Sequence, residues 1–178
     1  MSRLHTMNVA DAAGDTAGLF AAIKKAVGKV PNVYATMGTT APNVLAHVLH
    51  TGEVLKQAQL SSRELEAINL AVSEASGCDY CLAAHTVIGK MAGYTAEQTH
   101  KLRSGSFDDD AKIDALVKFA IALVSTSNTL PVHAVDSVKK AGYSDRQIIE
   151  IILAVSSILF TNMFNRVNDT VLDFPSPD

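Results

Sequence analysis

The 178-residue sequence contains no tryptophan, and aromatic residues make up only 6% of it. No stretch alternates clearly between polar and apolar residues, so β-strands are not expected. The net charge is −3 and no basic run is interleaved with aromatic residues, which argues against a nucleic-acid partner. Apolar residues nevertheless make up 48% of the chain, mostly Ala, Val, Leu and Ile, which favours closely packed helices around a sizeable core.

Neither a signal peptide nor a membrane span is expected from the hydropathy. Residues 1–15 lack the apolar h-region of a signal peptide. The longest apolar run, residues 151–160, is interrupted by two serines and is too short to cross a bilayer. We therefore expect a soluble cytoplasmic protein without membrane contact. In that compartment a structural disulfide is uncommon, and a CxxC pair more often serves redox chemistry or binds metal.

Hydrophobic spacing predicts helices along almost the whole chain, which we expect to fold as one all-α domain over residues 1–178. Residues 1–30 would form an N-terminal helical arm, and residues 60–93 would form the central core. Ser61 and Glu64 have the spacing of a capping box, which marks the start of a helix. The other predicted helices cover residues 15–29, 33–40, 42–59, 78–91, 107–128 and 145–172.

Two helix-to-helix corners repeat one local sequence. AGYTAEQ at residues 92–98 resembles AGYSDRQ at residues 141–147. Each has a glycine to end one helix in the left-handed conformation, then a tyrosine, a hydroxyl residue to cap the next helix, and a glutamine three residues later. The similarity indicates an internal helical-hairpin repeat, with chance similarity over so short a segment as the alternative.

The last predicted helix is apolar on nearly every side between Ile148 and Phe160. A helix of this kind is buried all round. In a chain of this length, contacts with other subunits would have to supply part of that cover, so we expect a homo-oligomer. Three asparagines follow at nearly helical spacing, and both a hydrogen-bonding role between subunits and a role at the active site are open for them: Asn162, Asn165 and Asn168.

The only two cysteines stand in the stretch SGCDYCLAAHT, residues 76–86. Cys78 and Cys81 lie at a predicted helix N-terminus, where free N–H groups and the helix dipole favour a thiolate. Their spacing of three residues puts both sulfurs on one face of the first turn. His85 lies one turn after Cys81 and can take its proton. This arrangement predicts an activated thiol, a resolving thiol and a base.

A histidine base needs a partner that orients its ring, and the preceding helix offers two carboxylates, Glu66 and Glu74. If two antiparallel helices meet at Gly77, the residue at the depth of His85 lies about two turns before the corner. This helix-length argument favours Glu66 over Glu74.

The cysteine pair also has alternative interpretations. Both cysteines could pack as small hydrophobic residues in a structural module. A zinc site would need a further ligand, and no second CxxC or nearby HxxxH supplies one. His47 and His50 are three residues apart and form a weak metal candidate, whereas His133 occupies the place of His85 in the repeat without a preceding thiol, which favours a structural role.

The order of Glu66, eleven residues, CDYC at residues 78–81, three residues and His85 resembles the active-site signature of the alkylhydroperoxidase D (AhpD) family. That family belongs to the carboxymuconolactone decarboxylase-like superfamily, and residues 162–175 also resemble its peroxidase-related members. The resemblance implies an all-helical bundle of the AhpD-like type. It also implies a trimer or hexamer and an antioxidant oxidoreductase with peroxiredoxin-type thiol peroxidase activity.

The same resemblance implies a role for each residue of the signature. Cys81 would react with a small organic peroxide or hydrogen peroxide, Cys78 would resolve the product, and His85 with Glu66 would relay protons. A lipoyl or thioredoxin-like dithiol would reduce the pair again, without flavin, haem or metal. Tyr80 stands where the type member of the family has a histidine, so the rate of proton transfer and the electron donor are in question. A thiol-disulfide adaptor or redox sensor without fast peroxide turnover is the alternative function.

Overall fold

The computed structural model describes residues 2–177, which form nine α-helices, one turn of 3-10 helix and no β-strand. The prediction of an all-α fold is therefore confirmed. The elements in chain order are η1 (Val9–Asp11), α1 (Gly14–Val27), α2 (Asn32–Thr40), α3 (Pro42–Lys56), α4 (Ser62–Ala75), α5 (Asp79–Met91), α6 (Ala96–Arg103), α7 (Ala111–Ser125), α8 (Val132–Lys140) and α9 (Asp145–Asn168).

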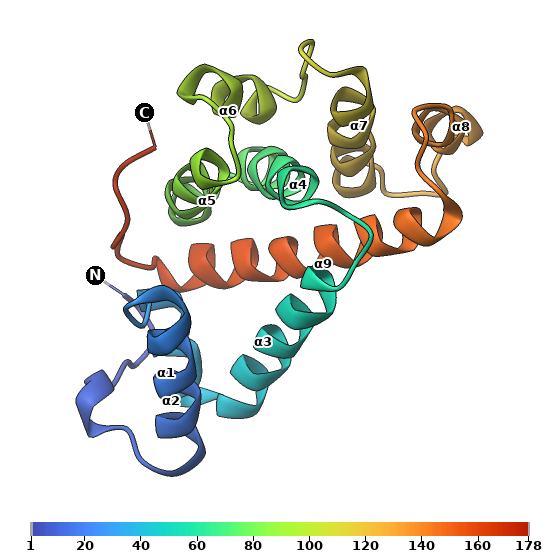
Figure 1. The fold of residues 1–178 in the computed structure, drawn as a ribbon. Helices are drawn as coiled ribbons and strands as arrows, with labels where there is room; N and C mark the ends of the chain where they lie inside the picture. Colours follow the sequence, from blue (N-terminus) through green and yellow to red (C-terminus); the bar gives the residue numbers. More distant parts are fainter. Residues whose placement is uncertain (1, 178) are drawn as a thin grey trace.

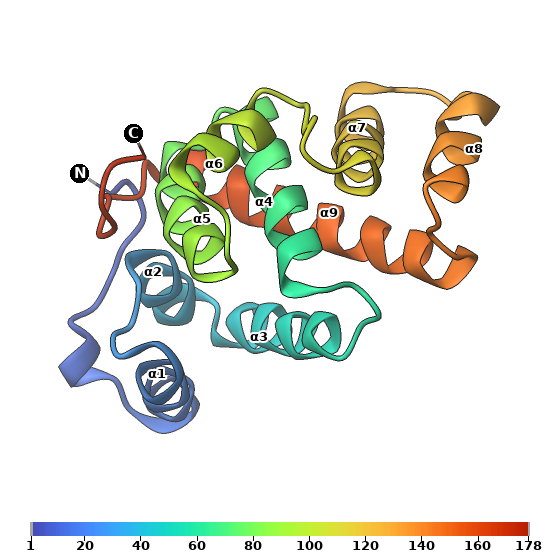
Figure 2. The same ribbon diagram turned by 45° about the horizontal axis from the view of Figure 1, so that its top comes forward.

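Helix α4 lies at the centre of the fold and packs against α5, α6, α7 and α9 (Figure 1). In Figure 1 α1, α2 and α3 lie below α9, while α4 to α8 lie above it. In the turned view of Figure 2, α4 crosses in front of α9. The apolar face of α4 is fully buried, as the 0% exposure of Ile68 and Val72 shows. Since α5 follows α4 directly and α9 crosses both, residues from these three helices meet in the core.

The predicted helix starts and stops are present in the structure. The Ser61 hydroxyl accepts the Glu64 N–H at 3.2 Å, and the Glu64 carboxylate accepts the Ser61 N–H at 2.8 Å, which completes the capping box. Gly93 and Gly142 have φ of 96° and 99°, a left-handed conformation that glycine adopts without strain. Both repeated corners continue with a capping box. The same local sequence thus forms the same corner twice.

Helices α7 and α9 are among those shorter than their hydrophobic pattern indicated. Helix α7 begins at Ala111 instead of residue 107, because the Asp110 carboxylate accepts the N–H groups of Lys112 and Ile113 and so caps the helix. Helix α9 ends at residue 168 instead of 172, because Asp169 adopts the left-handed conformation with φ of 52°. The residues after this turn form a tail that returns towards α2 and α5.

Helix α9 is not buried on every side within one chain, and part of its apolar surface is left without cover. An apolar stripe, defined by five exposed side chains spaced along the helix, faces away from the core: Ile149, Ile152, Phe160, Met163 and Val167. By length and composition alone α9 could cross a membrane, a property that core helices of soluble proteins share. Its opposite face packs against α4 and contributes Ile151 and Ile158 to the core.

Candidate active site

Cys78 and Cys81 are joined by a disulfide at the start of α5. Cys78 is the N-cap residue of this helix, and its sulfur accepts the backbone N–H of Cys81 at 3.3 Å. The two residues are only 1% and 2% exposed. After reduction, both sulfurs would lie at the positive end of the helix dipole, where a thiolate is favoured over a thiol.

A carboxylate on α4 orients His85. Glu66 Oε2 lies 2.8 Å from His85 Nδ1, and its other oxygen accepts a hydrogen bond from the Asn69 amide at 3.0 Å. Glu74 is directed elsewhere and pairs with Arg103 at 2.6 Å. Because an ionised carboxylate only accepts hydrogen bonds, His85 carries a proton on Nδ1, and in the neutral ring Nε2 is the base.

The three asparagines of α9 are all buried, and each has different partners within the chain. Asn165 Nδ2 donates to the Cys81 sulfur at 3.3 Å. Asn162 accepts from the Ser73 hydroxyl at 3.3 Å, and Asn168 accepts the backbone N–H of the N-terminal segment at 2.9 Å. Of the two roles left open by the sequence, the structure therefore places Asn165 at the cysteine pair. Its polarity within an apolar helix was the signal, but its target lies 84 residues away.

Tyr80, between the two cysteines, is bound by the C-terminal tail. Its hydroxyl donates to Asp173 at 2.6 Å, its ring packs edge-on against Phe174, and Asp173 also pairs with Lys29 at 2.9 Å. Burial and the hydrogen bond to Asp173 raise the pKa of Tyr80 well above its ordinary value. Tyr80 is thus a neutral hydrogen-bond donor and does not replace the second histidine of the family type member as a base.

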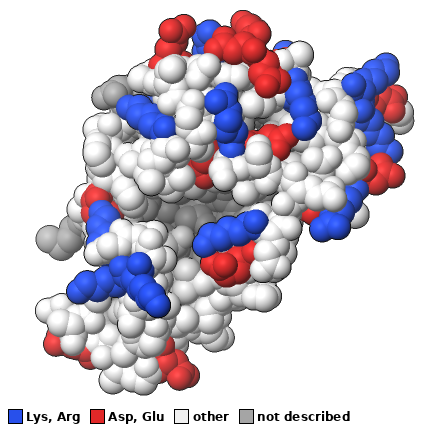
Figure 3. All heavy atoms as spheres, in the orientation of Figure 1, with Lys and Arg blue, Asp and Glu red and all other residues white. Residues whose placement is uncertain are grey.

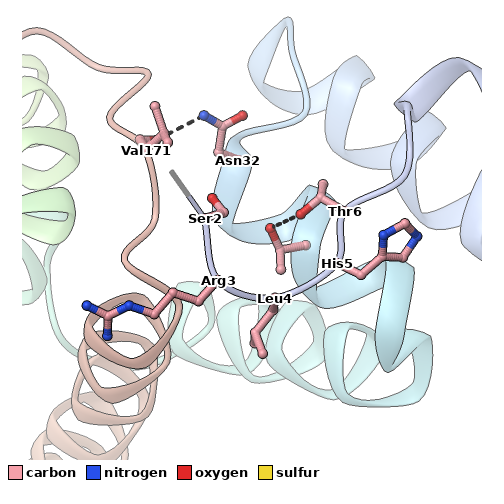
Figure 4. Close-up of a pocket in the computed structure, with 8 residues that line it drawn as sticks. Ser2, Arg3, Leu4, His5, Thr6, Asn32 and Val171 are labelled. Atoms are coloured by element: carbon pink, nitrogen blue, oxygen red, sulfur yellow. Dashed lines mark hydrogen bonds between the residues drawn. The ribbon is translucent and has the colours of Figure 1, made fainter.

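A cavity of about 640 Å³ lies between the N-terminal segment, α2 and the tail (Figure 4). There the Asn32 amide donates to the backbone oxygen of Val171 at 2.9 Å. A groove of about 260 Å³ separates α3 from α9. The residues that line these two spaces include none of the four predicted catalytic residues. The disulfide therefore lies beneath the surface, outside both cavities.

The described part of the chain, residues 2–177, offers no group of three or more His, Cys, Asp or Glu side chains that could hold a metal ion. The zinc interpretation of the cysteines and the weak candidate at His47 and His50 thus have no complete ligand set there.

On the face shown in Figure 3, acidic and basic side chains are interspersed.

Comparison with known proteins connects this geometry to a family. Residues 42–106, which include all four predicted catalytic residues, match the carboxymuconolactone decarboxylase family. Residues 42–106 therefore resemble that family, and the chain has an AhpD-like fold. The sequence resemblance is thereby confirmed at the level of the superfamily and fold. No curated protein sequence matches the chain.

Solved structures extend the similarity over nearly the whole chain. The AhpD core of a peroxidase-related protein from Ralstonia eutropha JMP134 has a TM-score of 0.87 and 19% identity, covering 97% of this chain and 92% of the other. A peroxidase-related protein from Silicibacter sp. TM1040 has a TM-score of 0.78 and 22% identity, covering 96% and 94%. A cysteine-to-alanine variant of the debrominase Bmp8, bound to 2,3,4-tribromopyrrole, has a TM-score of 0.82 and 19% identity, covering 99% and 94%. At these identities the likeness concerns the fold.

Proposed function

We propose that this AhpD-like protein is a thiol-dependent hydroperoxide reductase. The observation that carries the proposal is the disulfide between Cys78 and Cys81 at the N-terminus of α5, one helical turn from a histidine bonded to a buried carboxylate at 2.8 Å. This arrangement combines two sulfurs able to cycle between dithiol and disulfide with a base whose ring is held in place.

The reaction has three steps. His85, oriented by Glu66, takes the proton of Cys81. The thiolate attacks the hydroxyl oxygen of the peroxide, the O–O bond breaks, and the alkoxide takes the proton from His85 to leave as an alcohol. Cys81 is now a sulfenic acid, which condenses with the Cys78 thiol to form the disulfide and water. An external dithiol then reduces the disulfide by exchange and is itself oxidised.

The burial of both cysteines supports a small substrate, such as hydrogen peroxide or a short alkyl hydroperoxide. A lipoyl group or a thioredoxin-like protein, acting in the cytoplasm, would supply the dithiol. Exchange requires the attacking thiolate to reach one sulfur in line with the disulfide, and both residues are at most 2% exposed. A local opening at the start of α5 would therefore accompany reduction.

Three proteins test the proposal: the wild type, Cys78→Ser and Cys81→Ser. Each is fully reduced and mixed with one equivalent of hydrogen peroxide or cumene hydroperoxide. We expect the wild type to form one intramolecular disulfide, Cys78→Ser to form a sulfenic acid that dimedone traps, and Cys81→Ser to be inert. Full peroxidase activity in Cys81→Ser would end the assignment of Cys81 as the attacking thiol.

The same samples separate the proposal from the adaptor alternative. With excess dihydrolipoamide, a peroxidase consumes many equivalents of peroxide, whereas an adaptor or sensor forms its disulfide once and consumes little more. Rapid disulfide formation without sustained peroxide consumption would therefore favour the alternative. Thiols that stay reduced in the presence of peroxide would contradict both functions.

We also propose that the chain assembles into a homo-oligomer, a trimer or hexamer, through the apolar stripe of α9. Phe160 and Met163 are 38% and 50% exposed in the middle of this stripe, although they are large and apolar. Light scattering after size-exclusion chromatography should give a mass of three or six chains. Phe160→Asp should lower that mass, whereas Val132→Asp, at an exposed position on α8, should not. A monomeric wild type would contradict this part of the proposal.

A further inference from the structure

Asn165 uses only one end of its amide. The Nδ2 group donates to the Cys81 sulfur, while the Oδ1 atom is buried and has no hydrogen-bond partner. The residue is 3% exposed, and among the described residues only the Thr86 hydroxyl oxygen is likewise a buried side-chain atom without a partner. A buried carbonyl oxygen without a hydrogen-bond partner is destabilising. The unpaired Oδ1 next to the Cys81 sulfur therefore points to a ligand that can donate to it.

The orientation of the amide follows from the chemistry of the sulfur. A disulfide sulfur has no proton and can only accept, so the N–H end of the amide, and not its carbonyl end, must contact the Cys81 sulfur. After reduction and loss of the thiol proton, the same N–H would donate to a negatively charged sulfur. A hydrogen bond to a charged acceptor is stronger than one to a neutral acceptor.

We propose that Asn165 is a catalytic residue whose Nδ2 stabilises the Cys81 thiolate and whose Oδ1 accepts a hydrogen bond from the hydroxyl group of the bound hydroperoxide. This inference rests on the proposed function and deepens it. The two ends of one amide then hold the two atoms that become bonded, the sulfur and the hydroxyl oxygen. That oxygen keeps its own hydrogen when the O–O bond breaks, so the hydrogen bond to Oδ1 persists in the sulfenic acid.

The proton balance of this step does not involve the amide. The thiol proton passes to His85 and then to the departing alkoxide, while Asn165 neither gains nor loses a proton. Asn165 positions the sulfur and the hydroxyl oxygen relative to each other, and the packing of α9 against α4 and α5 fixes the position of its amide. Helix α9 thereby supplies a site residue that lies outside residues 42–106, the segment that matches the family.

The thiol pKa of Cys81 tests the donor end. In a Cys78→Ser background the N-cap is retained, because serine is a favoured cap, and Cys81 is the only thiol. Thiolate absorbance at 240 nm against pH gives its pKa. Asn165→Ala should raise that pKa by about 1–2 units, the equivalent of one hydrogen bond to a charged group. Asn162→Ala, the matched control one turn earlier on α9, removes an equally buried amide without contact to sulfur and should leave the pKa unchanged.

A competing substrate tests the acceptor end. Each variant is studied at a pH where its thiol is fully ionised, with hydrogen peroxide and with methyl methanethiosulfonate, which has no hydrogen-bond donor. The ratio of the two rate constants cancels the general nucleophilicity of the thiolate. Asn165→Ala should lower this ratio by roughly 3- to 10-fold, as expected for one hydrogen bond, and Asn162→Ala should not lower it.

Failure of this inference differs from failure of the proposed function. The pKa measurement needs no peroxide turnover, and circular dichroism with a melting curve checks the fold of each variant. If Asn165→Ala does not fold, Asn165→Leu replaces it, because leucine is similar in size, carries no charge and cannot donate a hydrogen bond. An unchanged pKa in a folded Asn165 variant, or an equal shift in Asn162→Ala, would overturn the assignment.

Discussion

Replacing Glu66 with glutamine tests how α4 orients the histidine of α5. The substitution keeps the size of the side chain but replaces one carboxylate oxygen with an NH₂ group. In the native protein one oxygen of Glu66 accepts from Asn69 at 3.0 Å and the other faces His85 Nδ1 at 2.8 Å. A glutamine has a single carbonyl oxygen and cannot accept from both partners.

The Asn69 amide therefore decides how the new glutamine turns. If the carbonyl stays with the Asn69 donor, the NH₂ group points at Nδ1, which must then accept a hydrogen bond. The ring proton moves to Nε2, and the imidazole loses its base on the side available to a thiol. General acid–base catalysis contributes about 10²- to 10⁴-fold to a rate, so Glu66→Gln should slow sulfenic acid formation at neutral pH by about that factor.

Stopped-flow mixing of reduced Cys78→Ser protein with hydrogen peroxide measures this rate. Glu74→Gln is the matched control, since Glu74 lies on the same helix but pairs with Arg103, and its rate should change by less than about threefold. Adding Asn69→Ala to Glu66→Gln removes the competing donor and lets the carbonyl turn to His85, so part of the rate should return. A Glu66→Gln rate equal to that of the wild type would refute the reasoning.

Three further predictions concern stability. Burial opposes ionisation of Glu64, but hydrogen bonds from its neighbours outweigh this effect and lower the pKa of Glu64 below 4.5. The ionised carboxylate should therefore stabilise the folded state above pH 4.5, and this stabilisation should decline below that pH. The urea midpoints at pH 7 and pH 4 should differ less in Glu64→Gln than in the wild type. A Cβ at Gly38 would lie 2.5 Å from the Phe20 ring, so Gly38→Ala should destabilise by about 1–3 kcal/mol in urea titrations, whereas Gly52→Ala, with open space, should stabilise by about 0.5–1 kcal/mol. Tyr80→Phe removes the hydrogen bond to the tail and should lower stability by roughly 1.5 kcal/mol with less than a threefold change in peroxide rate.

Local signals in the sequence were sufficient for most of the helical framework. The capping box at Ser61 and the left-handed glycines at the two repeated corners involve residues only a few positions apart, so their spacing predicts them directly. The start of α7 and the end of α9 were harder to predict from the sequence. There a side-chain cap at Asp110 and a left-handed Asp169 end the helices inside runs whose hydrophobic pattern continues.

The candidate active site likewise contains a part that local spacing predicts and a part that it does not. CxxC and the following histidine lie on one helix, so their relative position follows from helical geometry, and a helix-length argument led to Glu66 across a single corner. Only the tertiary structure decided that Asn165 contacts the Cys81 sulfur and that the tail binds Tyr80. These contacts join residues 84 and 93 positions apart, and no local spacing encodes the packing of α9 and the tail against α5 that brings them together.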